Sequence, residues 1–463
     1  MRVVLINLFL VFTLKMTVFG QVDIPHHRQE KFNNELLIGN RSSKKIFKSK
    51  RVLEKQVNAL DDAYGIVVSR KRSEAIRVLE SYKANTRLDT LREIDLSFLG
   101  LRKIPDFVFG AKNLEVLVLD YNNIKRLPKE LRLLGKMKRL YWRANNLEDV
   151  LWIRIAKLNN LEKLDVSKNK LTRLPRGVRR VKELEELVVE ECLFDEIPVH
   201  RLSKNPSLKT VSFNRNHFPL NLAKGNYDKL DFIEIFKLNN IGLHDIHPSF
   251  YLMSGLKELQ LQENHISSIP EGIGALQQLQ KLSFYKNKLE KIPNDLFGLK
   301  NLVAVDFYYN ALQVVPEEIG MLINLEILYL SHNKIYTLPE SIGNLSLLSE
   351  LYLHHNRFTA LPSAISQLDI LETCRVNENY LMEFPIQFLA LKQLKDLDLS
   401  NNQIKKIPRE ILNMPSLDLF TMTNNPIDFT DPKNEDIADL LFELSQKGVT
   451  VAPKIEKQIV ENQ

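Results

Sequence analysis

The sequence lacks most of the features on which enzymes and membrane proteins depend. It has two cysteines in 463 residues, so one disulfide is the upper limit. It contains no phosphate-binding loop, serine-hydrolase elbow, zinc-protease helix or paired-cysteine metal motif. Beyond residue 20, no apolar run has the roughly 20 residues that a membrane span requires. These absences predict a chain that is not an enzyme, binds no cofactor or metal and has no integral membrane segment apart from a leader.

The first twenty residues have the pattern of a secretory signal peptide. Arg2 gives a positive start, and Val3 to Leu14 form an apolar stretch too short to span a bilayer. Val18 and Gly20 occupy the small-residue positions before a cleavage point, which leaves Gln21 as the new terminus. We therefore predict a signal peptide over residues 1–20 and a secreted, periplasmic or cell-envelope location. The alternatives are an uncleaved anchor or a cytoplasmic protein without export.

A basic segment follows the predicted leader. The formal net charge is +7, and part of the excess lies in Arg41, Lys44, Lys45, Lys48, Lys50, Arg51 and Lys55. Such a run can contact an anionic surface or nucleic acid, but it is more often a solvated linker. We interpret residues 21–50 as a flexible basic segment and expect no nucleic-acid partner.

A 23-residue period governs most of the chain. Aliphatic residues recur at this step at Leu256, Leu279, Leu302, Leu325, Leu348, Leu371, Leu394 and Leu417. Each begins the same phrase, as in Leu325, Leu328, Leu330, Asn333, Ile335, Leu338 and Pro339. Looser versions begin near Leu91, Leu114, Met137, Leu161, Leu184, Leu208 and Ile233. The two sets together predict about fifteen repeats, which cannot bury their apolar faces singly and must stack.

The phrase itself predicts a strand followed by a turn. Its first half has period two, so the leucines point inward and the intervening residues form an exposed face. The asparagine at position nine lies where the chain leaves the strand, and its amide can satisfy backbone groups there. We expect a ladder of Asn122, Asn145, Asn169, Asn216, Asn264, Asn287, Asn310, Asn333, Asn356, Asn379, Asn402 and Asn425. The proline that follows, as in Pro316, predicts the first position of a short helical turn.

The two cysteines fall in core positions of distant repeats. Cys192 replaces the ladder asparagine of repeat five, and Cys374 fills an inward leucine position of repeat thirteen. Eight repeats at about 4.8 Å per strand separate them, so they cannot form a bond within one molecule. Both are predicted to be buried, reduced side chains.

The repeats divide into two blocks between helical ends. Repeat seven resembles repeat one, because each replaces the ladder asparagine with an aliphatic residue followed by glycine, Leu99-Gly100 and Ile241-Gly242. We therefore predict a solenoid over residues 91–430, with blocks 91–232 and 233–430. The overlong sixth repeat before the joint indicates a bend or insertion, or only a tolerated surface insertion. Residues 51–90 are predicted as an N-terminal helical cap and 431–463 as a C-terminal cap.

The phrase with Leu338-Pro339-Glu340-Ser341-Ile342-Gly343-Asn344-Leu345 resembles a known family. It is similar to the 23-residue leucine-rich repeats of Ras-suppressor-type proteins, of plant intracellular Ras-group proteins and of exported bacterial proteins. The resemblance implies an α/β solenoid, a leucine-rich-repeat horseshoe with a parallel concave sheet that binds a protein partner. Secreted animal members usually have disulfide-bonded caps, so the cysteine content here favours a bacterial exported protein or an intracellular one.

Aromatic residues gather on the exposed strand face of repeats nine to twelve. The candidate partner-binding residues are Tyr285, Tyr308, Tyr309, Tyr329, His332, Tyr352, His354 and His355. Tyrosine is enriched at interface centres, because a large ring with a polar tip loses little entropy on binding. The alternative is that aromatic residues simply favour strands.

The histidines of this group allow a second interpretation. His332 and His355 occupy one position in adjacent repeats, about 5 Å apart, which permits a shared metal. The sequence shows no further residues that would orient the histidine rings around a metal, so we expect no metal. We favour a contact with a partner that weakens when the histidines acquire charge below about pH 6.

Charged residues form two bands in the first block. Basic residues concentrate in repeat three and acidic residues in repeat five, as Lys138, Arg139, Arg143, Glu185, Glu186, Glu190 and Glu191. Opposite patches could orient a partner, or the bands could be an ordinary mixed surface.

Two functions follow. The first is a non-enzymatic, exported protein that recognises a protein, or alternatively a glycan, on its concave face. The second is an intracellular scaffold or signalling regulator of the Ras-suppressor type.

Overall fold

The computed structural model describes residues 73–82, 84, 87–147, 152–174, 177–218, 221–222, 225–427 and 435–453. The predicted signal peptide and basic segment lie outside the described residues. The chain separates into two compact units, Met1–Thr86 with Asp95–Gly100, and Arg87–Ile94 with Leu101–Gln463. In the first unit, residues 73–82 are helical, within the segment predicted as the N-terminal cap. Among the described residues, none belongs to a helix long and apolar enough to cross a membrane.

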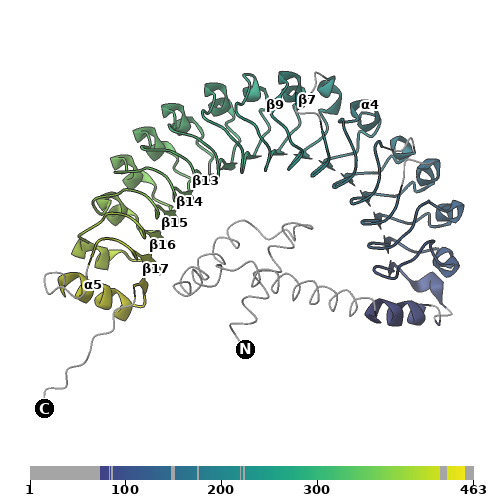
Figure 1. The fold of residues 1–463 in the computed structure, drawn as a ribbon, viewed down its shortest axis with the longest axis horizontal. Coiled ribbons are helices and arrows are strands. Elements are labelled where there is room, and N and C mark those ends of the chain that lie inside the picture. The colour runs from purple at the N-terminus through teal and green to yellow at the C-terminus, as the bar shows by residue number, and fades with distance from the viewer. Residues whose placement is uncertain are drawn as a thin grey trace, which may run out of the picture. The chain divides into compact units, whose positions relative to one another are not determined.

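The second unit is a curved solenoid with one parallel sheet along its inner edge (Figure 1). The sheet has sixteen strands. They are β1 (Glu93–Asp95), β2 (Val116–Val118), β3 (Arg139–Tyr141), β4 (Lys163–Asp165), β5 (Glu186–Val188), β6 (Thr210–Ser212), β8 (Ile235–Lys237), β10 (Glu258–Gln260), β11 (Lys281–Ser283), β12 (Ala304–Asp306), β13 (Ile327–Tyr329), β14 (Glu350–Tyr352), β15 (Thr373–Arg375), β16 (Asp396–Asp398), β17 (Leu419–Thr421) and β18 (Thr450–Ala452). All except β18 begin two residues after a predicted repeat start, which confirms the fifteen repeats and the horseshoe.

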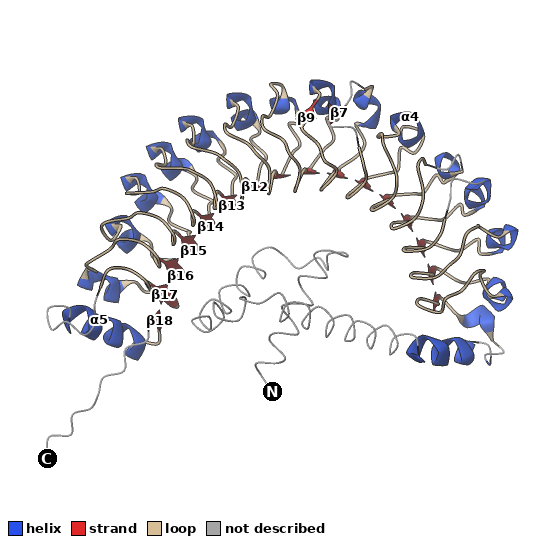
Figure 2. Cartoon of the chain, viewed as in Figure 1, coloured by secondary structure: helices blue, strands red, loops and turns tan. Residues whose placement is uncertain are grey.

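Short helices form the outer edge of the solenoid, opposite the strands (Figure 2). They are η2 (Leu88–Thr90), η3 (Asp106–Gly110), η4 (Lys129–Leu133), η5 (Trp152–Lys157), η6 (Val178–Arg180), α4 (Val199–Leu202), η7 (Tyr227–Leu230), η8 (Pro248–Leu252), η9 (Ile273–Ala275), η10 (Asn294–Gly298), η11 (Glu317–Met321), η12 (Glu340–Asn344), η13 (Ser363–Gln367), η14 (Ile386–Ala390) and η15 (Arg409–Asn413). All but α4 are 3-10 helices. Figure 2 shows one such turn for most repeats, so each repeat contributes a strand to one face and a helical turn to the other.

In nine of the described repeats the proline lies one residue earlier than predicted, as the N-cap of the helical turn, whereas Pro248 of η8 lies at the first helical position. Pro316 precedes η11 as its N-cap, with φ −63° and ψ 153°. Its carbonyl accepts the N–H of Ile319 at 3.1 Å and so opens the helical turn. The ring fixes φ near the value that this position needs, and a cap residue needs no N–H for the helix, so the physical reason for proline is unchanged.

The inward leucines and the asparagine ladder hold the repeats together. Leu328 and Leu330 are fully buried. Asn333 Oδ1 accepts the N–H of Leu312, from the preceding repeat, at 3.0 Å. Its Nδ2 donates to the carbonyl of Phe307 in that repeat and to Leu330 in its own, both at 2.9 Å. Each amide thus joins two repeats, and the same acceptor bond occurs at every predicted ladder residue.

The joint between the blocks leaves the main sheet continuous. β6 pairs with β8, with Thr210 opposite Ile235. The extra residues of repeat six instead form β7 (Asn221–Leu222), which pairs with β9 (Asp245–Ile246) in a separate two-stranded sheet. The sixth repeat therefore carries an insertion that pairs away from the concave face.

The C-terminal end combines a helix and a strand. α5 (Glu435–Gln446) lies within the segment predicted as the C-terminal cap and buries Leu440, Leu441 and Leu444. Arg409, at the start of η15, forms an ion pair with Glu443 of α5 at 2.8 Å. β18, which the sequence did not predict, extends the sheet beyond β17.

Both cysteines are buried and reduced, as predicted. Cys192 Sγ donates to the carbonyl of Val166 at 3.5 Å, a weak substitute for the ladder amide. Burial raises the pKa of its thiol to about 12, so it remains protonated at neutral pH.

Candidate functional site

The strand register brings one row of the predicted site together. Position five of successive repeats places Asp306, Tyr329 and Tyr352 opposite one another in β12, β13 and β14. The rings of Tyr329 and Tyr352 stack with centroids 4.8 Å apart. Tyr352 is only 4% exposed, and its hydroxyl donates to Glu350 Oε2 at 2.8 Å. Tyr329 is half-buried, so it presents the accessible ring of this pair.

Position seven supplies a second row. The rings of Tyr285 and Tyr308 stack with centroids 5.5 Å apart. The intervening repeat has the buried Ser331 at this position, and Tyr308 then contacts the ring of His354 at 5.5 Å. His354 is 7% exposed, so it lies beneath the more accessible rings.

Position eight supplies a column of parallel rings. Tyr309 stacks on His332, and His332 stacks on His355, with centroids 3.9 Å apart in both cases. All three residues have positive φ, between 52° and 56°. This left-handed conformation turns the chain off the strand, and the N–H of His332 then donates to the carbonyl of His354 in the next repeat at 2.9 Å. This strained backbone conformation therefore fixes the direction in which each side chain of the column leaves the chain.

The eight predicted residues form two groups. The aromatic cluster consists of Tyr285, Tyr308, Tyr309, His332, His354 and His355, joined by ring contacts between 3.9 and 6.0 Å. The tyrosine pair consists of Tyr329 and Tyr352. The sequence predicted one patch. In the structure it divides into the tyrosine pair, at position five in β13 and β14, and the aromatic cluster, at positions seven and eight beyond the ends of β11 to β14.

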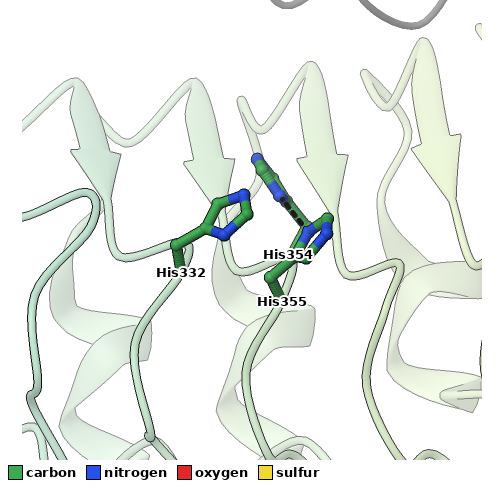
Figure 3. Close-up of side chains that lie close together, drawn as sticks. All are labelled: His332, His354 and His355. Atoms are coloured by element: carbon green, nitrogen blue, oxygen red, sulfur yellow. Dashed lines mark hydrogen bonds between the residues drawn. The ribbon is translucent and has the colours of Figure 1, made fainter. Parts of the chain in front are cut away.

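The three histidines lie with their ring nitrogens close together (Figure 3). His354 Nδ1 and His355 Nδ1 are 3.0 Å apart, a hydrogen bond in which one nitrogen donates and the other accepts. One nitrogen from each of His332, His354 and His355 lies within 4.8 Å of the others. Imidazole nitrogens at this spacing can share a proton or coordinate a metal ion.

The surroundings of His332 favour its neutral form. Burial lowers its pKa to about 3, and the neighbouring His355 and His354 act in the same direction. A neutral imidazole at pH 7 keeps one nitrogen lone pair for a ligand and stacks without charge repulsion.

Several residues that the sequence did not assign contribute to the site. The ammonium of Lys286 lies 5.4 Å from the ring centroid of Tyr285, a cation–π contact. Ser283 Oγ donates to Asp306 Oδ2 at 2.8 Å, and Asp306 Oδ1 accepts the N–H of Tyr308 at 3.0 Å. Asp306 thus fixes the backbone at Tyr308 locally and, through Ser283, joins two neighbouring repeats.

The charged bands of the first block pair mainly with residues of the repeats next to them, and one ion pair, Arg143–Glu191, joins the two bands. Glu191 has Arg143, Lys168 and Arg215 within 3.9, 3.4 and 3.4 Å. Two of the other acids of the band also pair with bases of neighbouring repeats, as Lys163–Glu186 at 2.8 Å and Lys209–Glu185 at 3.2 Å, whereas Glu190 accepts hydrogen bonds from Ser212 and Asn214. The predicted opposite patches are therefore a largely neutralised network, which weakens the case for electrostatic orientation of a partner.

Comparisons with known proteins agree on one class. The family described as leucine rich repeat matches residues 254–312, 301–358 and 360–427. A leucine-rich-repeat protein of Leptospira interrogans is 30% identical, with 80% of this chain and 97% of that protein covered and a TM-score of 0.64. An internalin of Listeria monocytogenes is 18% identical, with 74% and 93% covered and a TM-score of 0.53.

A plant peptide hormone receptor, RGFR1 in complex with RGF2, is 25% identical, with 73% of this chain and 64% of the receptor covered and a TM-score of 0.51. A search of proteins with curated descriptions finds no match to this chain. The similarity to Ras-suppressor-type repeats stays a sequence-based expectation.

Proposed function

Because the chain belongs to the leucine-rich-repeat family, whose members are generally protein-binding scaffolds, we propose that it binds a protein partner through the aromatic cluster and the tyrosine pair. The observation that carries this proposal is the concentration of stacked rings in and directly after β11 to β14. Tyr309 is 39% exposed, while Tyr285, Tyr308 and Tyr329 are half-buried. Rings held in place by their neighbours lose little entropy when a partner covers them, which favours binding.

The buried members of the predicted site have a different role. Tyr352 and His354 lie under their neighbours and support the accessible rings. We propose Tyr285, Tyr308, Tyr309 and Tyr329 as the contact residues, with His332 and His355 at the edge of the surface. The partner is a protein, as RGF2 is bound to the related plant receptor; a glycan, which can also stack on tyrosine, is the alternative ligand. The chain acts without catalysis.

We also propose that the protein is exported. The support is the pattern of residues 1–20, with its positive start, short apolar stretch and small residues before Gln21. Cell fractionation with N-terminal sequencing tests this point. A mature chain that begins at Gln21 supports export, whereas a cytosolic chain that retains Met1 supports the intracellular scaffold.

A pull-down compared between matched variants tests the binding surface. In the test variant, Tyr285, Tyr308, Tyr309 and Tyr329 are replaced by Ala; in the control, Tyr336 and Tyr380, which are 53% and 55% exposed and lie outside the strands, are replaced by Ala. Proteins captured by the wild type and the control, but not by the test variant, are the expected result. The test variant should have a lower Tm, because four stacked rings are lost, and a single cooperative thermal transition shows that it is folded. Equal capture by all three proteins would exclude this surface.

A further inference from the structure

Three histidines from two repeats meet at one point of the concave face. His354 and His355 are consecutive residues after β14, and His332 occupies the position of His355 one repeat earlier. One ring nitrogen from each lies within 4.8 Å of the others, the one such group of three among the described residues. Figure 3 shows the three rings gathered at the end of two neighbouring strands.

We propose that His332, His354 and His355 bind one divalent transition-metal ion, with zinc as the ion to test. Imidazole nitrogen suits zinc, copper and nickel, and three protein ligands leave a coordination position for water or for a group of a bound partner. The site stands on the geometry of the histidines alone. It does not rest on the proposed protein binding.

The observed spacing is close to what one ion requires. Zinc–nitrogen bonds are about 2.0–2.1 Å, so two nitrogens on the same ion are at most about 4.2 Å apart and about 3.4 Å apart in a tetrahedral site. The His354 and His355 Nδ1 atoms, at 3.0 Å, already meet this requirement. The ring nitrogens all lie within 4.8 Å of one another, so the widest separation must shorten by up to about 1.4 Å to reach the tetrahedral spacing.

A rotation of the stacked rings achieves this closure. The planes of His332 and His355 are only 18° apart, so their lone pairs do not yet converge. The torsion between Cβ and the ring is broad and permits the rotation without backbone movement. The proton shared by His354 Nδ1 and His355 Nδ1 is displaced when both rings take the tautomer that is protonated at Nε2.

Two neighbouring features support the site. Tyr309 stacks on His332, and the ring of Tyr308 lies 5.0 Å from it, so aromatic walls exclude water from one side. Glu378 is the next residue of the position-eight column after His355, and like His355 it has a positive φ, of 55°. Its carboxylate interacts electrostatically with His354, so it contributes negative charge near the three histidines.

The direct test is a titration of the metal-free full-length protein with zinc. We expect one ion per chain, bound with micromolar or tighter affinity, and a rise in Tm when zinc is present. His332→Gln and His355→Gln should each weaken binding at least tenfold. Gln keeps the size and polarity of the side chain, and the unfolding curve without zinc shows whether each variant is folded.

Two control variants separate this site from other histidines. His244 and His265 also lie in adjacent repeats, with ring centroids 5.1 Å apart, but they form a pair without a third ring nitrogen in the group. Replacing both by Gln should leave the affinity unchanged. The same is expected for His26→Gln with His27→Gln, a consecutive pair outside the described residues.

Copper gives an independent readout of the ligands. Electron paramagnetic resonance of the copper-loaded protein should show nitrogen coordination that His332→Gln and His355→Gln reduce. The proposal is overturned if zinc binds no more tightly than millimolar, or if the two variants bind it as tightly as the wild type. Because no partner is present in these measurements, a failed pull-down leaves the result unaffected, and a failed titration leaves the protein-binding proposal intact.

Discussion

At position eight, repeats four to six and repeats ten to twelve share one backbone conformation and carry different chemistry. The residues and their φ angles are Lys168 55°, Glu191 49° and Arg215 57° in the first stretch, and Tyr309 56°, His332 52° and His355 55° in the second. The first three form ion pairs and the second three stack. Residues in one column of a parallel sheet are about 5 Å apart, so like charges repel there. Alternating charges avoid this repulsion in the first stretch, and stacked rings avoid it in the second.

The comparison separates what makes the fold from what makes the surface. Inward positions are alike in the two stretches, as with Leu187 in β5 and Leu328 in β13, both fully buried. Outward positions are free to differ because their side chains leave the leucine core unchanged. The charges of the first stretch neutralise one another, whereas the rings of the second keep polar tips and accessible edges. We therefore expect mutations to affect stability equally in the two stretches when they point inward, and differently when they point outward.

The largest effect is expected at the inward positions. Leu328→Ala and Leu187→Ala each remove a fully buried side chain, and each should lower the free energy of unfolding by about 2–5 kcal/mol. Denaturant midpoints measured side by side test the equivalence. If the loss at Leu187 were less than half that at Leu328, the first stretch would be packed more loosely, and the comparison of the two surfaces would not rest on equal cores.

The next effect concerns the ladder, which is complete in the second stretch and broken in the first. Asn333→Ala leaves the N–H of Leu312 without its acceptor and the carbonyl of Phe307 with one donor, Asn310 Nδ2, in place of two, and should cost about 1–3 kcal/mol. Cys192→Asn restores the missing rung and should raise stability by about 1 kcal/mol. Thermal unfolding of both variants tests this, because Tm should fall for Asn333→Ala and rise for Cys192→Asn. A destabilised Cys192→Asn would show that repeat five has adapted its packing to the smaller sulfur side chain.

The third effect is the pH dependence that the ring column contributes. The folded state holds the pKa of His332 at about 3, below its ordinary value near 6.5, so the unfolded chain binds a proton more readily. Stability from this group is present above about pH 6.5 and is lost as the pH falls toward 3, by less than about 1.4 kcal/mol per pH unit because the ring is half-buried. The wild type should lose more Tm between pH 7 and 5 than His332→Gln. Equal losses would show that the column does not resist protonation.

The sequence predicted those features that depend on local chemistry. The inward leucines follow from strand periodicity, and the ladder follows from the hydrogen-bond donors and acceptor of the asparagine amide. Both were therefore identified residue by residue. The left-handed turn at position eight was missed, although Asn240, Asn401 and Asn424 occupy it and asparagine tolerates this conformation well.

Features that depend on neighbouring repeats were beyond the sequence. The burial of Tyr352 results from the ring of Tyr329 that stacks on it, and the burial of His354 accompanies ring contacts with Tyr308, His332 and His355. The charged bands were visible, but their pairing was not, because it depends on side-chain reach between repeats. The membership of the site was predictable, and its division into supporting and accessible rings was not.

The smallest effect distinguishes the two columns by their response to salt. Glu191→Gln removes the partner of Arg143, Lys168 and Arg215 and leaves three cations together, which should lower stability by about 1 kcal/mol at low ionic strength. Tyr309→Ala removes a stacked ring and should lower it by about 0.5–1.5 kcal/mol. At 1 M salt the Debye length falls to about 3 Å, so the loss from Glu191→Gln should shrink.

The loss from Tyr309→Ala should persist in salt, because stacking does not depend on net charge. Glu185→Gln is the control for the ion pairs, since Glu185 and its partner Lys209 are 54% and 51% exposed and such pairs contribute little. Tm measured at 0.05 M and 1 M salt for the three variants tests this. If both column variants lost the same stability at both ionic strengths, the ion-paired column would also be held by packing, and the contrast between the two stretches would be one of shape and not of electrostatics.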